Sequence, residues 1–123
     1  MTVLAALAST TPGIVDPTPR GGFRAALAFY PGCREQEKQN YLPYAPLLML
    51  LASDDEEVSP AVCQRFAERT AARGGPIDFV IYPGAQHAFD DPGPRKQSND
   101  ANRAATADAR KRAEEFFARY LRE

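Results

Sequence analysis

The only histidine of this chain, His87, stands in the stretch IYPGAQHAFDDPG, directly after an apolar run. An imidazole can act as a general base when a carboxylate accepts a hydrogen bond from one ring nitrogen and the other nitrogen takes a proton from a nucleophile. Carboxylates occur in the stretch SDDEEVSP, residues 53–60, which follows another apolar run. These residue types indicate hydrolysis by a base-activated nucleophile.

Three short apolar runs predict the strands that position these groups. They are RAALAFY (24–30), PLLMLLA (46–52) and IDFVIY (77–82), and each is bounded by proline or glycine. Nearly continuous apolar runs of this length are typical of strands buried on both faces of a parallel sheet.

Helices are predicted between and around these runs. Ser59 can cap a helix that has Pro60 at its first position and ends at Gly74-Gly75. A last helix is predicted over about 101–121 and a first helix over Thr2–Ser9. The predicted buried stripe of the last helix consists of Ala105, Ala109, Ala113, Phe116, Phe117, Tyr120 and Leu121.

This order of elements predicts one α/β domain over residues 1–123, with a three-stranded parallel sheet flanked by helices. Ligands of open α/β sheets bind beyond the carboxyl ends of the strands. The loops after the second and third strands leave the sheet at that edge. We therefore expect an aspartate of residues 53–60 to lie beside His87.

Composition excludes several other classes of function. A net charge of −1, with 15 basic and 16 acidic residues, leaves no basic surface for nucleic acid, and no apolar run is long enough for a membrane span. Two cysteines do not form a disulfide framework and favour a cytoplasmic location. The acidic run 54–57 lacks calcium-loop spacing, so we expect no metal ion and no cofactor.

The chain resembles the C-terminal half of the dienelactone hydrolase family of α/β-hydrolases. The matching sequence segments are FRAALAFYPGC, YLPYAPLLMLLASDD, VIYPGAQHAFDDPGP and ADARKRAEEFFARYL. The resemblance implies that His87 is the triad histidine and that Asp55, rather than Asp54, is the triad acid. It also implies a hydrolase of esters or lactones.

The nucleophile of the family is missing from this pattern. Family members carry it in a G-x-[CS]-x-G turn followed by a helix. No such motif occurs in the 123 residues, and MTVLAALAST resembles the helix that follows it, so we expect the chain to start just after the turn.

Cysteine and serine side chains elsewhere in the sequence are candidate nucleophiles, but each also has a structural explanation. Cys33 lies near the same edge of the sheet. The family has a cysteine at the end of the stretch FRAALAFYPGC without using it in catalysis, which favours a structural role. Cys63 lies on the apolar face of its helix, and Ser59 is better explained as a helix cap than as a nucleophile. Tyr30, Phe29 and Phe89 either line an acyl pocket or pack in the core.

The expected function is therefore weak or absent ester hydrolysis by His87 and Asp55, with water or a Ser or Cys of a second subunit as nucleophile. The alternatives are a non-catalytic assembly module, one subunit of a split hydrolase, or a gene fragment. The edge of the strand at 24–30 predicts a homodimer through this strand, including Ala26 and Ala28, and the first helix. Antiparallel pairing of two such edges would make a six-stranded sheet.

Overall fold

The computed structural model describes residues 3–6, 23–39 and 41–121 of the chain. Three strands and five helices follow one another along these residues. They are α1 (Val3–Ala6), β1 (Ala26–Phe29), α2 (Arg34–Lys38), β2 (Leu47–Ala52), α3 (Pro60–Ala72), β3 (Ile77–Tyr82), α4 (Pro94–Gln97) and α5 (Asp100–Leu121).

The strands form one parallel sheet in the order β1-β2-β3, as the apolar runs predicted. Ala26 lies opposite Leu47 at one end of the β1–β2 pair, and Ala52 lies opposite Tyr82 at the end of the β2–β3 pair. Because this register is in phase, the loops that follow β2 and β3 leave the sheet at the same edge.

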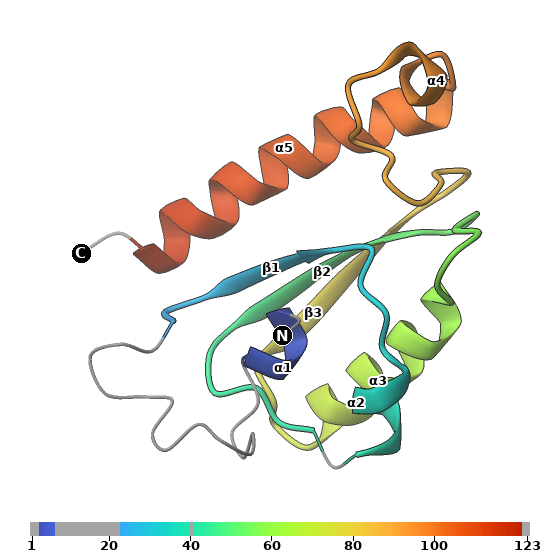
Figure 1. The fold of residues 1–123 in the computed structure, drawn as a ribbon. Helices are drawn as coiled ribbons and strands as arrows, with labels where there is room; N and C mark the ends of the chain where they lie inside the picture. Colours follow the sequence, from blue (N-terminus) through green and yellow to red (C-terminus); the bar gives the residue numbers. More distant parts are fainter. Residues whose placement is uncertain (1–2, 7–22, 40, 122–123) are drawn as a thin grey trace.

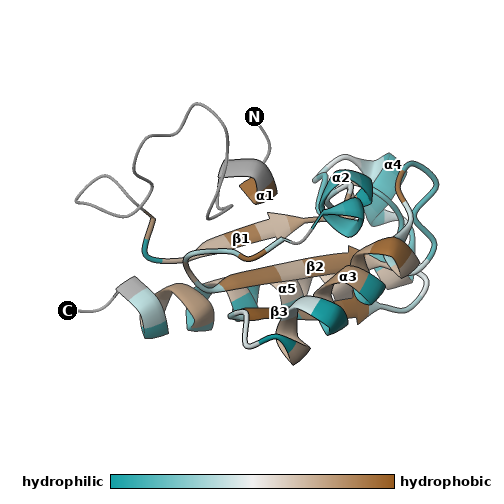
Figure 2. Cartoon of the chain, turned by 90° about the horizontal axis from the view of Figure 1, so that it is seen from below, coloured by the Kyte–Doolittle hydropathy of each residue, from teal (hydrophilic) through white to brown (hydrophobic). Residues whose placement is uncertain are grey.

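The sheet lies between two layers of helices (Figure 1). Every residue of the central strand β2 is buried. Its odd-numbered side chains, such as Met49, pack in a core with α1 and α3, whereas the even-numbered ones, such as Leu50, pack in a second core beneath α5. Figure 2 shows the strands as the most apolar part of the fold, with the short helices α2 and α4 hydrophilic.

The signals that predicted α3 act as expected. The Oγ of Ser59 accepts a hydrogen bond of 3.4 Å from the backbone N–H of Val62, and Pro60 occupies the first turn. The helix is followed by Gly74 at a φ of +87°, a conformation that glycine adopts without strain.

The other helices agree with the sequence in part. In α5, Ala105 and Ala109 are buried, whereas Ala113, Phe116, Phe117 and Tyr120 are only half-buried and the side chain of Leu121 lies outside the described part. Only Val3–Ala6 of the predicted first helix is described; Thr2 and residues 7–9 lie outside the described residues. The single-turn helices α2 and α4 were not predicted. None of the described helices is long and apolar enough to cross a membrane.

The two cysteines form a disulfide, so the expectation that they remain free is wrong. Cys33 and Cys63 are 30 residues apart in sequence, yet their Cα atoms are 5.1 Å apart. The loop after β1 and the first turn of α3 meet on the same face of the sheet, which cysteine count alone does not reveal. Since disulfides persist in oxidising compartments, the cysteine argument for a cytoplasmic location no longer holds.

Candidate active site

The loops that follow β2 and β3 are tied together where they leave the sheet. The N–H of Ser53 donates to the carbonyl of Tyr82 (3.1 Å), and the N–H of Asp54 donates to the carbonyl of Ala85 (2.9 Å). The N–H of Gly84 donates to Ser53 Oγ at 2.7 Å. These bonds extend the β2–β3 pairing beyond the strands and bring the next residues of both loops together.

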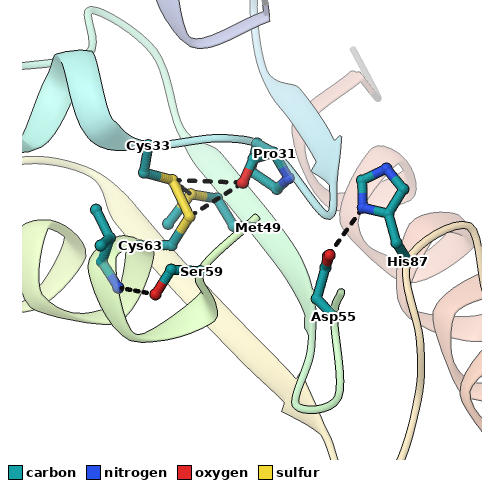
Figure 3. Close-up of a disulfide and its surroundings, with 8 residues drawn as sticks. Pro31, Cys33, Met49, Asp55, Ser59, Cys63 and His87 are labelled. Carbon is teal, nitrogen blue, oxygen red and sulfur yellow. Dashed lines mark hydrogen bonds and ion pairs between the residues drawn. A yellow bond between two sulfur atoms is a disulfide. The ribbon is translucent and has the colours of Figure 1, made fainter. Parts of the chain in front are cut away.

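Asp55 and His87 meet at this point. Asp55 Oδ2 lies 2.9 Å from His87 Nδ1, and the two side chains reach toward each other from the loops after β2 and β3 (Figure 3). The carboxylate side chain is 1% exposed and the imidazole side chain 20% exposed. An ionised carboxylate only accepts hydrogen bonds, so Nδ1 carries the proton and Nε2 of the neutral ring keeps its lone pair.

The second oxygen of Asp55 is held by the backbone of its own loop. Oδ1 accepts hydrogen bonds from the N–H groups of Glu57 (2.8 Å) and Val58 (2.9 Å). Burial by itself raises the pKa of Asp55, but the hydrogen bonds from Val58, His87 and Glu57 outweigh it and leave the pKa below its usual value. Asp55 is therefore ionised at neutral pH and can stabilise a positive charge on the imidazole.

The sequence predicted that an aspartate of this loop would lie beside His87, and the contact is with Asp55, the one that the family resemblance implied. Asp54, the adjacent candidate, lies on the exposed side of the loop, where its Oδ1 accepts a hydrogen bond from Ser53 Oγ at 3.1 Å. The hydrogen bonds from the backbone of Glu57 and Val58 turn the loop so that Asp55, and not Asp54, contacts His87 Nδ1.

The loop of His87 is held by residues that the sequence did not indicate. The N–H of His87 donates to Glu56 Oε1 (3.2 Å), and the N–H of Gln86 donates to Oδ1 of the fully buried Asn102 (3.0 Å). Ala88, which follows the histidine, has a φ of +59°. The sequence signal that could have indicated Asn102 is a polar amide side chain at a position on the buried face of α5.

Tyr30 contacts the imidazole from the end of β1. The two ring centroids are 4.6 Å apart in an edge-on arrangement, and the tyrosine hydroxyl donates to Asp90 Oδ1 at 2.7 Å. Burial and the adjacent Asp90 raise the pKa of Tyr30 well above its usual value, so the hydroxyl keeps its proton. Its φ of +39° is a strained conformation for an aromatic residue, as is found at functional sites.

Phe89, by contrast, belongs to the core. It is fully buried and contacts the rings of Phe29, Tyr30 and Tyr82. Packing therefore accounts for Phe89, whereas Tyr30 lies at the site.

The nucleophiles considered from the sequence have other roles. Cys33 and Cys63 are joined to each other and carry no thiol (Figure 3). Ser59 caps α3, and Ser53 is bonded to Asp54 and Gly84. Among the residues that the structure describes, no serine or cysteine lies within hydrogen-bond distance of His87 Nε2, and no three His, Cys, Asp or Glu side chains form a group that could hold a metal ion.

Solved structures of esterases have the same fold. Native esterase 2 of the Planctomycetes species Thermogutta terrifontis matches with a TM-score of 0.65 and 16% identity, over 94% of this chain and 50% of the esterase. The same esterase phosphorylated by paraoxon matches with a TM-score of 0.64 and 20% identity, over 94% of this chain and 48% of the esterase. The chain thus spans about half the length of these structural neighbours.

Family comparison agrees with this fold and extends over most of the sequence. No match was found among curated proteins. The model of the dienelactone hydrolase family matches residues 15–121, a range that includes the strands, the disulfide and the Asp55–His87 pair. The chain therefore belongs to the dienelactone hydrolase family.

Proposed function

We propose that Asp55 and His87 are the acid–base pair of a site that hydrolyses carboxylic esters or lactones. The observation that carries the proposal is the 2.9 Å hydrogen bond from the imidazole Nδ1 to a buried carboxylate at the carboxyl ends of parallel strands. Family membership supports hydrolase ancestry, and carboxylate–imidazole pairs of this kind activate the nucleophile in hydrolases.

In this proposal His87 moves one proton twice. Its Nε2 takes the proton from a hydroxyl, a thiol or water as the nucleophile attacks the carbonyl carbon of the ester. The same nitrogen then gives that proton to the oxygen of the leaving alcohol. Asp55 stays ionised throughout, holds the imidazole in the required tautomer and stabilises the imidazolium between the two steps.

The 123 residues do not contain the nucleophile motif that the family uses. No G-x-[SC]-x-G occurs in the sequence, and the disulfide leaves neither cysteine as a thiolate. We propose that these residues alone hydrolyse esters weakly or not at all. Water activated by His87, or a Ser or Cys of a second polypeptide, is the nucleophile in this proposal.

Ester turnover by the 123-residue chain is expected to be at least a hundredfold below that of a complete family member. The physical reason is that even one oxyanion donor contributes about 10²–10³ in kcat, and the 123 residues contain no G-x-[CS]-x-G turn to carry the nucleophile. The measurement is hydrolysis of p-nitrophenyl acetate, with buffer and heat-unfolded chain as controls.

A fluorophosphonate probe provides the second arm of this test. It reacts with activated serines and is expected to label no serine of the chain at one-to-one stoichiometry. Labelling of a single serine to completion, lost on prior unfolding, would show a nucleophile within the chain and contradict the proposal.

A second proposed role is assembly, either as a module without activity or as one subunit of a split hydrolase. The observation that favours it is the edge strand β1. Ala26 N–H donates to the carbonyl of Pro46, and Tyr30 N–H donates to that of Leu50. Because successive residues of a strand point their backbone groups to opposite sides, those of Leu27 and Phe29 point away from β2. In the described part of the chain, β1 pairs with a strand on one side only.

We expect a homodimer through residues 24–30 and the first helix, with the two β1 edges paired antiparallel. Sedimentation equilibrium at micromolar concentration is then expected to give twice the chain mass of 13.5 kDa. Leu27→Pro removes an outward N–H and should shift the equilibrium toward monomer, whereas Leu27→Val keeps this N–H and should not. A wild-type chain that is monomeric and unfolds cooperatively would contradict the expectation. Ala26→Pro is unsuitable here because its N–H pairs with β2.

A further inference from the structure

We propose that the site prefers neutral or cationic acyl esters over esters that carry a carboxylate, and that Glu57 is the residue that makes this selection. The inference rests on the proposed function, because it names the substrate class of the same site. The geometry around the second ring nitrogen of His87 points to it.

Glu57 stands beside the nitrogen at which the chemistry would take place. Its Oε1 lies 3.8 Å from His87 Nε2, while Asp55 Oδ2 lies 2.9 Å from Nδ1. A substrate carbonyl that receives a nucleophile activated by Nε2 must lie within a few ångströms of that nitrogen. Any charge near that carbonyl therefore interacts directly with the Glu57 carboxylate.

The other charged groups of the two loops do not cancel the negative electrostatic potential that Glu57 creates near His87 Nε2. The only cation paired with these loops in the described part, Lys96, has its Nζ 3.6 Å from Glu56 Oε2, so its charge is matched. Asp90 and Asp91 follow His87 on its own loop, and Asp90 accepts the hydrogen bond of Tyr30.

A cavity that is lined in part by Glu57 also has more negative than positive side chains in its wall. It has a volume of about 380 Å³, and its charged lining residues are Arg34, Glu35 and Glu57. Val58, Val62 and the disulfide residue Cys33 supply apolar wall. Neither Asp55 nor His87 lines this cavity, but its two carboxylates against one guanidinium add a net negative charge beside Glu57.

Alkylation of His87 measures this selection without any need for turnover. His87 is the only histidine, so its modification is read from a single peptide by mass spectrometry. Iodoacetamide is neutral and iodoacetate anionic, and both transfer a CH₂-linked group to a ring nitrogen with loss of iodide. The quantity compared is the ratio of the iodoacetate rate constant to the iodoacetamide rate constant, relative to the same ratio for N-acetylhistidine amide, which carries no carboxylate, under identical conditions.

We expect iodoacetate to be disfavoured at His87 by about fivefold relative to N-acetylhistidine amide, the factor for two like charges about 4 Å apart in water. Glu57→Gln should shift the ratio toward that of N-acetylhistidine amide, with Asp55 and Glu56 left in place. Glu114→Gln, which removes an exposed carboxylate of α5, should leave it unchanged. Raising the salt concentration to about 1 M should weaken the discrimination, because the Debye length falls to about 3 Å.

Three outcomes would overturn the inference. They are a ratio of iodoacetate to iodoacetamide rates at or above that of N-acetylhistidine amide, equal effects of the Glu57 and Glu114 substitutions, and no alkylation of His87 by either reagent. Failure of the proposed function is a separate result: in that case ester hydrolysis does not depend on His87, while the alkylation ratio still shows the expected discrimination and its weakening in Glu57→Gln.

Discussion

Replacing His87 by alanine is expected to lower the hydrolysis of p-nitrophenyl acetate by about 10²–10⁴-fold, or to the background rate of the buffer, because a positioned general base contributes this much. The side chain is partly exposed, and its removal takes away one hydrogen bond to Asp55, so the fold should persist. Initial rates on purified wild type and variant, with circular dichroism spectra of both, make the measurement.

The two adjacent aspartates provide the matched control for this prediction. Asp55→Asn keeps the shape of the side chain but removes the charge that fixes the tautomer of His87, so a large loss of rate is expected. Asp54→Asn alters an exposed side chain that accepts a hydrogen bond from Ser53 Oγ, and it should change the rate little. Equal losses in both variants, or a His87→Ala rate equal to that of wild type, would show that the pair does not perform the hydrolysis.

Reduction of the disulfide is expected to lower the free energy of unfolding by roughly 3–4 kcal/mol, because the bond closes a loop between cysteines 30 residues apart and so restricts the unfolded chain. This is a large part of the stability of a domain of this size. Urea unfolding followed by circular dichroism, with and without dithiothreitol, measures the difference.

A double variant, Cys33→Ala with Cys63→Ala, separates the bond from the reagent. Its unfolding should be insensitive to dithiothreitol and close to that of the reduced wild type. Thiol titration of the unfolded, unreduced chain should detect no free thiol. Two thiols per chain before reduction, with unchanged unfolding after it, would contradict the bond.

Much of this fold follows from signals that act over a few residues. The runs at 46–52 and 77–82 correspond to β2 and β3 within one residue, because mostly apolar stretches of six or seven residues bounded by proline and glycine are typical of strands. Ser59 and Pro60 place the start of α3 for the same local reason. The position of an aspartate of residues 53–60 beside His87 could also be predicted, since parallel strands bring the loops at their carboxyl ends to one edge. The family resemblance singled out Asp55.

The remaining features depend on distances between segments that are remote in sequence. The disulfide requires the loop after β1 to lie against α3, and the contact of Glu57 with His87 requires a turn stabilised by Asp55. Tyr30 reaches both His87 and Asp90 only because β1 lies in register with β2. Sequence by itself determined the elements and the meeting of the loop at 53–60 with His87, because periodicity, caps and strand order are local or topological. The family resemblance supplied Asp55 as the aspartate of the pair. Only the tertiary structure decided what surrounds that pair, because side chains 30 or more residues apart meet through packing, which no spacing along the chain encodes.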